Sequence, residues 1–246
     1  MKKIVEVAAD SVASAWAAEK GGAKRIELCE NLPQGGVTPS YGKLLVVKEK
    51  CNLPINVLIR PRKGDFLYTS EELEVILKDV EICRELGMNG IVFGALTRDG
   101  NIDLEMTQLV FDCAKDMDFT FHRAFDLCQN PLEAIAQLKH IGIKRILTSG
   151  QKPTAPQGAE NIASYIQAAK GTISFMVGGG VRPESVAPLL AIADIHEFHT
   201  SGATPIKSQM NFKGNTPLGA EDPEAEFTWN QTNEEVIRAL VGKVSA

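Results

Sequence analysis

Short apolar runs rich in β-branched residues alternate along the whole chain with longer amphipathic segments of helical period. The short runs predict eight strands, at residues 4–10, 25–30, 55–61, 90–96, 119–126, 144–150, 172–180 and 194–201. Helical segments separate them, as parallel strands require of their crossover connections. We therefore expect one parallel sheet built from the whole chain.

Residues typical of helix ends mark where the helical segments begin and stop. Ser11 can cap the first helix, which Gly21 and Gly22 end. Ser70, followed by two glutamates, opens a long helix that ends at Gly87. Three further helices are predicted to start at Asp103, Pro131 and Pro183, and a final one covers residues 233–244.

A closed eight-stranded (β/α)₈ barrel, forming a single domain over residues 1–246, is the fold class that this alternation favours. The chain has 246 residues, close to the usual length of such a barrel. The alternative is a doubly wound open sheet, which usually carries a glycine-rich turn after its first strand. Here that turn reads Asp10-Ser11-Val12, so closure is the better interpretation.

One connection departs from the regular alternation. Residues 202–232, between the eighth strand and the last helix, are rich in Gly, Pro, Asn and Gln. A structureless connection of this length is uncommon inside a domain and is typical of a lid, an interface or a mobile loop.

Charge and cysteine content narrow the class of protein. The net charge of -5 disfavours a nucleic-acid partner, which needs a dense Lys/Arg face. No apolar run approaches the roughly 20 residues that span a bilayer, and none at the N-terminus has signal-peptide length. The five cysteines form no C-x-x-C pair, which argues against disulfides and structural zinc. We expect a cytoplasmic protein with no membrane or nucleic-acid partner.

Strand alternation predicts which side chains point into the barrel. Because helices cover the outside, the aliphatic face of each strand should point outward and the other face inward. The inward set contains an unusual number of charged and imidazole groups: Glu6, Glu27, Cys29, Arg60, His122, Asp126, Glu197 and His199. Barrel interiors are ordinarily filled by branched aliphatic residues, so this set is the main functional signal.

Buried charges must pair with one another or contact a ligand. They could form a self-satisfied ion-pair cluster that stabilises the barrel. They could instead form a catalytic site for a small phosphate or carboxylate, acting by proton transfer, isomerisation or lyase chemistry. In that case Glu27 or Glu6 is the general base and His122 the general acid. The anion-binding and substrate-binding candidates are Arg60, Arg62, Asp126, Ser149, Gly178, Gly179, Gly180 and His199.

Several segments resemble the copper homeostasis protein CutC family, whose members form a TIM barrel. The resemblance runs from VEVAADS to EFHTSGATP and is carried by GGAKRIELC, GGVTPSYG, IRPRKGDFLY, GIVFGALTRDG, FHRAFD, RILTSGQ and GGGVRPE. It implies a cytosolic protein of copper homeostasis that binds Cu(I), and a homodimer or homotetramer.

The resemblance also implies a metal ligand. The family's proposed copper thiolates lie on the first two strands; Cys29 matches the second, whereas Ala8 occupies the first and has no ligand atom. Copper homeostasis through Cu(I) at Cys29 is thus the leading hypothesis, and an enzyme acting on a small anionic metabolite is the alternative. A third interpretation is a binding or assembly module that uses residues 202–232 as its interface.

Overall fold

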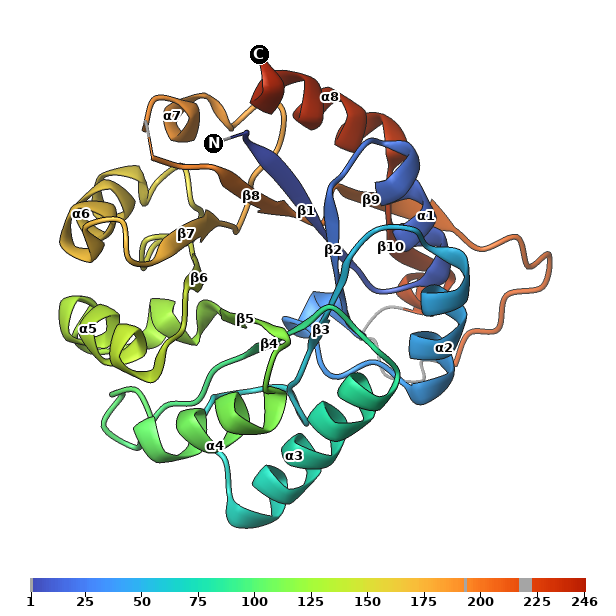
Figure 1. Cartoon of the computed structure of the whole chain (residues 1–246). Coiled ribbons are helices and arrows are strands. Elements are labelled where there is room, and N and C mark those ends of the chain that lie inside the picture. The colour runs from blue at the N-terminus through green and yellow to red at the C-terminus, as the bar shows by residue number, and fades with distance from the viewer. Residues whose placement is uncertain (1, 193, 217–222) are drawn as a thin grey trace.

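Eight parallel strands form a closed ring at the centre of the computed structural model, which describes residues 2–192, 194–216 and 223–246 (Figure 1). The strands follow one another in chain order, and β8 pairs with β1 to close the ring, with Val5 opposite Phe198. They are β1 (Ile4–Ala9), β2 (Arg25–Leu28), β3 (Ile55–Leu58), β4 (Gly90–Phe93), β5 (Asp118–Phe121), β6 (Arg145–Thr148), β7 (Ser174–Val177) and β8 (Glu197–Thr200).

Helices surround this ring on its outer side (Figure 1). They are α1 (Val12–Lys20), α2 (Tyr41–Lys50), α3 (Ser70–Glu85), α4 (Leu104–Ala114), α5 (Pro131–Ile141), α6 (Ala159–Ala169), α7 (Ala187–Leu190) and α8 (Glu234–Ser245). In the part of the chain that the structure describes, three short 3-10 helices lie in the connections: η1 (Leu32–Gln34), η2 (Arg123–Leu127) and η3 (Pro223–Phe227). The arrangement confirms the closed (β/α)₈ barrel and excludes the open sheet.

Local capping explains most helix starts. The hydroxyl of Ser11 accepts the N–H of Ser14 at 3.0 Å, and Asp103 caps α4 in the same way. Helix α3 begins at Ser70, as expected, with Thr69 as its cap in a reciprocal capping box with Glu72.

The helix predicted to start at Pro183 is wrong. Helix α7 spans only Ala187–Leu190, and a turn precedes it. The hydroxyl of Ser185 holds this turn, because it accepts the N–H of Arg182 at 3.1 Å and donates to the carbonyl of Gly180 at 2.8 Å. These bonds close a turn ahead of α7, which is only one helical turn long.

The expectation of a structureless connection over residues 202–232 is also wrong. Strands β9 (Ala203–Lys207) and β10 (Thr228–Thr232) pair antiparallel in a hairpin outside the barrel (Figure 1). The hairpin packs on α1, where the N–H of Thr232 donates to the hydroxyl of Ser14 at 3.2 Å. Residues 217–222 lie outside the described part, so the hypothesis of a lid at that tip stays untested.

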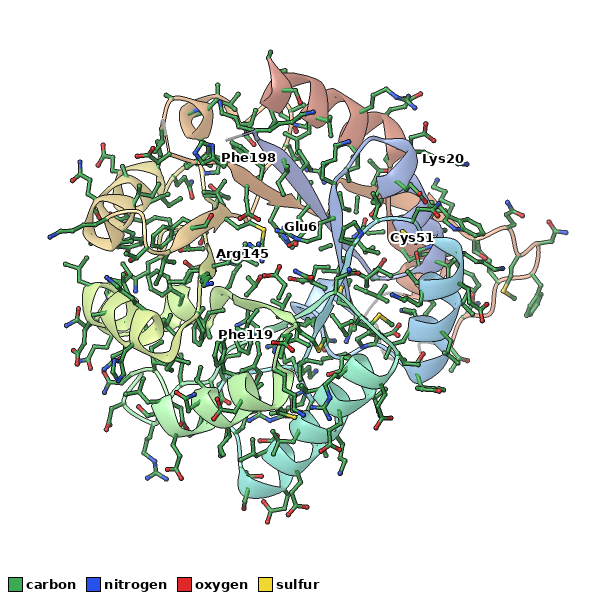
Figure 2. All side chains as sticks on the ribbon, in the orientation of Figure 1. Glu6, Lys20, Cys51, Phe119, Arg145 and Phe198 are labelled. Carbon is green, nitrogen blue, oxygen red and sulfur yellow. The ribbon has the colours of Figure 1, made fainter. Side chains whose placement is uncertain are left out.

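The barrel wall separates two kinds of packing. Outward-facing Val7, Ile26, Val57 and Phe198 are fully buried in the main hydrophobic core beneath the helices. Inside the ring lies an ion-paired layer, and Figure 2 shows Glu6 and Arg145 projecting into it.

In this layer Arg25 binds the carboxylates of both Glu6 and Glu197. Arg145 lies 2.9 Å from Glu197 and also binds Asp118. The self-satisfied cluster considered from the sequence therefore exists, but it accounts for only part of the interior charge. The residues one step further along the strands open into a cavity.

Candidate active site at the barrel mouth

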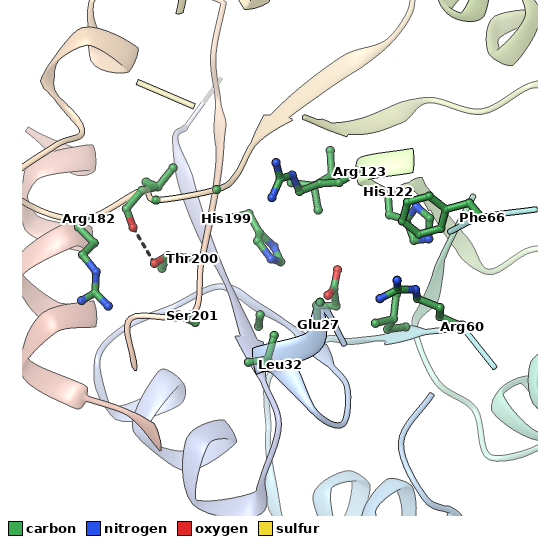
Figure 3. A pocket seen from close by; sticks show the side chains of 17 residues that line it. Glu27, Leu32, Arg60, Phe66, His122, Arg123, Arg182, His199, Thr200 and Ser201 are labelled. Atoms are coloured by element: carbon green, nitrogen blue, oxygen red, sulfur yellow. Dashed lines mark hydrogen bonds between the residues drawn. The ribbon is translucent and has the colours of Figure 1, made fainter. Parts of the chain in front are cut away.

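A cavity of about 430 Å³ lies at the carboxyl ends of the strands (Figure 3). Its wall includes Glu27 from β2, Arg60 after β3, His122 after β5 and His199 from β8. Two of these residues lie on strands and two lie just after strands, and all four point to the same end of the barrel. Arg123, Arg182, Gly179, Gly180 and Ser201 complete the polar wall.

Glu27 is the acidic group of the cavity. Its side chain is buried, and its Oε2 has no hydrogen-bond partner among the described residues. Burial raises the pKa of this carboxyl to about 7, although the charge of the nearby His199 acts to lower it. Near neutral pH, Glu27 can therefore both accept and donate a proton.

His199 and Glu6 form a hydrogen-bonded pair beside Glu27. The two residues are opposite each other in the β1–β8 register, and Nδ1 of His199 lies 2.8 Å from Oε1 of Glu6. Burial alone would lower the pKa of His199, yet the carboxylates of Glu27 and Glu6 raise it. Despite its own burial, Glu6 has a pKa of about 2, because Arg25 and His199 stabilise its charged form.

Glu6 is not one of the described residues that line the cavity. Both of its carboxylate oxygens bind protein groups, Arg25 and His199. This placement suits a residue that orients His199 rather than one that contacts a ligand.

His122 is a neutral imidazole with a defined tautomer. Burial, reinforced by the cation of Arg60, lowers its pKa to about 3. Its Nδ1 accepts the N–H of Ala124 at 3.1 Å, so the single ring proton must sit on Nε2. That Nε2 is buried and has no partner among the described residues. His122 thus presents an unused hydrogen-bond donor.

Arg60 is a buried cation held entirely by neutral groups. Its Nη1 donates to the carbonyl of Gly36 at 2.8 Å and its Nη2 to that of Gly64 at 2.6 Å. The guanidinium also stacks over the ring of Phe66 at 4.9 Å. No carboxylate within the described residues forms an ion pair with it, and its Nε has no partner. Arg60 is therefore a fixed positive charge with no counter-ion in the described part of the chain.

The loops after β5 and β6 are organised by Asp126. This carboxylate binds Nε of Arg123 at 2.7 Å and accepts the N–H of Ser149 at 3.0 Å. Arg123 also donates to the hydroxyl of Ser149 at 2.8 Å. Asp126 and Ser149 do not belong to the described cavity wall; they position Arg123, which does.

Two other predicted anion-binding positions lie off the wall. Arg62 points away and pairs with Asp65 at 3.0 Å and with Glu72 at 2.5 Å. Gly178 is absent from the described lining, whereas its neighbours Gly179 and Gly180 belong to it.

Cys29 fits a copper site poorly. It is fully buried with Leu58 and Val92 in a small interior cluster, and it is not part of the described cavity wall. Its Sγ donates to the carbonyl of Ala9 at 3.7 Å. Burial, together with the negative charge of Glu27, raises the pKa of the thiol well above its usual value. Copper(I) binds the thiolate, so binding at Cys29 would require release of the proton that burial keeps on the sulfur.

Glu6, Glu27 and His199 form the one group of potential metal ligands found in the described residues, with ligand atoms within 4.8 Å of one another. Two of the three donors are carboxylates, which suit hard cations rather than Cu(I). Glu6 is moreover committed to Arg25 and His199. The donor set does not match the soft ligands that Cu(I) prefers.

Comparison with known proteins places this barrel in a family. The CutC family profile matches residues 3–204. The chain belongs to the CutC family. A CutC family protein of Parabacteroides distasonis is 43% identical over 98% of this chain and 100% of its own length. The human relative, named copper homeostasis protein cutC homolog, is 41% identical over 96% of this chain and 87% of its own length.

Among solved structures, CutC of Streptococcus agalactiae superposes with a TM-score of 0.77 and 29% identity, over 81% of this chain and 98% of that protein. The CutC family assignment confirms the resemblance seen in the sequence. No described helix of this CutC-family chain is long and apolar enough to cross a membrane.

Sequence reasoning missed four arginines of the barrel interior and mouth: Arg25, Arg123, Arg145 and Arg182. Arg25 and Arg145 could have been predicted from strand alternation. Each lies two residues before an inward-facing residue, Glu27 and Leu147 respectively. Arg123 begins the 3-10 helix η2 and Arg182 lies at the turn that follows β7, and strand alternation does not apply in either segment.

Proposed function

We propose that this CutC-family barrel binds a small anionic carbonyl compound at its mouth and catalyses proton transfer on it. One observation carries the proposal: Oε2 of Glu27, Nε of Arg60 and Nε2 of His122 are all buried and unpartnered, and all three residues line the same cavity. Leaving such groups unsatisfied costs about 1–3 kcal/mol each, more for charged groups. A ligand that pairs with them removes this cost.

The three residues have complementary chemistry. Glu27, with a pKa of about 7, is suited to remove a proton from carbon beside a carbonyl and to return it. The Nε2–H of His122 is suited to donate to the oxyanion that this removal creates, and a neutral donor keeps its proton throughout. Arg60 supplies a fixed positive charge for an anionic group of the same ligand.

His199 adds a second proton-carrying group on the same wall. Its Nδ1 is engaged by Glu6, which leaves Nε2 available to the ligand. The carboxylates of Glu27 and Glu6 favour the protonated form of His199, and this form is suited to protonate a leaving oxygen or a neighbouring carbon. Isomerisation and elimination both use this combination of one base and one acid.

Deuterium exchange tests the proposal directly. Small 2-oxo and 2-hydroxy acids and hydroxyketones are incubated with the full chain in D₂O, and loss of C–H signal is followed by ¹H NMR. Exchange should fall by about 100-fold or more in Glu27→Gln, the usual cost of removing a general base. Arg60→Gln should weaken binding, whereas Arg62→Gln, an arginine off the described wall, should not. Exchange that persists in Glu27→Gln would overturn the proposal.

Copper binding is the second candidate, supported by the name of the human relative and by the position of Cys29 directly after β2, in the segment that matches the family motif. Anaerobic Cu(I) titration against a competing chelator tests it on wild type and Cys29→Ala. The control is Cys113→Ala, a half-buried cysteine on α4 outside the barrel. Loss of tight binding in Cys29→Ala alone supports a site at this thiol. Equal, weak affinity in all three proteins excludes it.

A further inference from the structure

The cavity has a second group of hydrogen-bond donors, remote from Arg60, which bears on the class of ligand. It is built from the segment that follows β7, with Gly179, Gly180 and Arg182, and from Ser201 after β8. Figure 3 shows Arg182 and Arg60 on opposite sides of Glu27. We propose that this end holds the phosphate of a phosphate monoester whose carbonyl portion reaches Glu27 and His122. This inference rests on the proposed function and specifies its substrate class.

Hydrogen bonds brace the two segments against each other. Thr200 donates its hydroxyl proton to the carbonyl of Val181 at 2.7 Å and accepts the N–H of Gly202 at 3.0 Å. Arg182 donates from Nη2 to the carbonyl of Ala203 at 2.7 Å. The chain after β7 and the chain after β8 are thus fixed relative to each other before any ligand binds.

Backbone donors remain unused at this end. Among the hydrogen bonds of the described residues, none uses the N–H of Gly179, Gly180 or Ser201. Gly179 and Gly180 have φ angles of +98° and +69°, a conformation that residues with a Cβ rarely adopt. Successive backbone N–H groups in such a conformation can form a concave site that binds an anion.

The balance of charge also calls for a ligand with more than one negative group. Arg123 is neutralised by Asp126, whereas neither Arg60 nor Arg182 forms an ion pair within the described residues. A ligand with negative charge at both ends would compensate the two arginines at once.

The number of donors favours phosphate over carboxylate at the Arg182 end. Three backbone N–H groups, the hydroxyl of Ser201 and the guanidinium of Arg182 exceed what the two oxygens of a carboxylate can accept comfortably. A phosphate monoester offers three terminal oxygens and a charge near -2 at neutral pH. The segments after strands 7 and 8 are also a common location for phosphate in barrels of this fold.

Binding measurements on the full chain test the assignment with defined probes. Glycerol 3-phosphate and inorganic phosphate are titrated by calorimetry and ³¹P NMR, with glycerol and glycerate as unphosphorylated counterparts. Arg182→Gln keeps a hydrogen-bond donor for the carbonyl of Ala203 but removes the positive charge. Arg182→Lys restores the positive charge without the planar guanidinium group. Arg60→Gln tests the opposite end. Arg238→Gln, on the exposed face of α8, is the matched control, and thermal melts verify folding.

Arg182→Gln should weaken glycerol 3-phosphate binding by about tenfold or more, the usual worth of a charge-assisted hydrogen bond. Arg182→Lys should recover part of this loss, whereas Arg60→Gln and Arg238→Gln should change the affinity by less than about threefold. Unchanged affinity in Arg182→Gln, or a loss confined to Arg60→Gln, overturns the assignment.

The two proposals fail separately. If unphosphorylated acids exchange deuterium in a Glu27-dependent manner while phosphate esters do not bind at Arg182, the phosphate assignment alone is wrong. If glycerol 3-phosphate binds through Arg182 but no carbonyl compound exchanges, the proton-transfer proposal is wrong and the phosphate subsite stands.

Discussion

Nδ1 of His199 lies 2.8 Å from Oε1 of Glu6, across the seam where β8 closes onto β1. The barrel closure itself therefore forms this pair, since the two residues are 193 positions apart in sequence. Arg25 fixes Glu6 from the other side and is itself shared with Glu197. The ion-paired layer thus supports the imidazole that reaches the cavity.

Glu6→Gln should lower the pKa of His199, because the amide removes one of the two carboxylates that hold it up. Folding raises the pKa of His199 above its value of about 6.5 in the unfolded chain. Protonated His199 therefore stabilises the folded protein at pH values below 6.5, and this stabilisation is lost as the pH rises through the pKa of the folded state. As the pH rises through this range, the free energy of unfolding should fall less in Glu6→Gln than in wild type. ¹⁵N-edited NMR titration of His199 measures the shift directly, and an unchanged pKa would show that Glu6 does not control the imidazole.

Glu27→Gln should stabilise the protein at alkaline pH. Folding raises the pKa of Glu27 from 4.5 to about 7, so ionisation between these values disfavours the folded state, and stability falls as pH rises. Each pKa unit is worth about 1.4 kcal/mol, which gives the variant an advantage of about 3 kcal/mol at pH 8 that disappears near pH 4.5. Urea unfolding at both pH values measures it, with exposed Glu235→Gln as the control. Equal stability at pH 8 would mean that Glu27 is not strained by burial.

The imidazole of His122 should remain neutral, with its proton on Nε2, from pH 8 down to pH 5. Burial and the cation of Arg60 hold its pKa at about 3, and the N–H of Ala124 occupies Nδ1. The ¹⁵N shifts of the ring should therefore identify the Nε2–H tautomer throughout this range. Arg60→Gln removes the nearby positive charge and should therefore raise the pKa of His122. A titration near the ordinary value of 6.5 in wild type would contradict the assigned role as a neutral donor.

The placement of Glu27, Arg60, His122 and His199 on one wall was predictable from sequence. Alternation is a local property, since every second residue of a strand faces the same side, and the outward aliphatic face fixes which side that is. The same rule predicts Arg25, which shares a face with Glu27 and would have revealed the ion-paired layer.

Features that depend on contacts between distant segments were not predictable. The hairpin of β9 and β10 is set by pairing across 20 intervening residues and by docking on α1. The turn after Pro183 was missed for a local reason, because the hydroxyl of Ser185 bonds nearby backbone groups and competes with helix formation. Cys29 faces the interior as alternation predicts, but only the packing of Leu58 and Val92 over it shows that it is enclosed.

Cys29 should react with a thiol reagent much more slowly than Cys113 in the native protein. It is fully buried and its pKa is raised by burial and by Glu27, whereas Cys113 is half-buried. Iodoacetamide labelling followed by peptide mass analysis should modify Cys113 first and Cys29 only on unfolding. Rapid modification of Cys29 in the folded protein would reopen the case for a copper thiolate at this position.

Thr200→Val should both destabilise the barrel and weaken the phosphate subsite. The substitution preserves shape but removes a hydroxyl that bonds Val181 and Gly202, and thereby leaves a buried carbonyl and a buried N–H unsatisfied. We expect a loss of about 2 kcal/mol in the free energy of unfolding, and Thr200→Ser should restore most of it. Because the two segments are no longer fixed relative to each other, glycerol 3-phosphate should bind more weakly even at temperatures where the variant is fully folded. Stability loss with unchanged phosphate affinity would show that the brace serves the fold alone and that the donors after β7 and β8 are not organised by it.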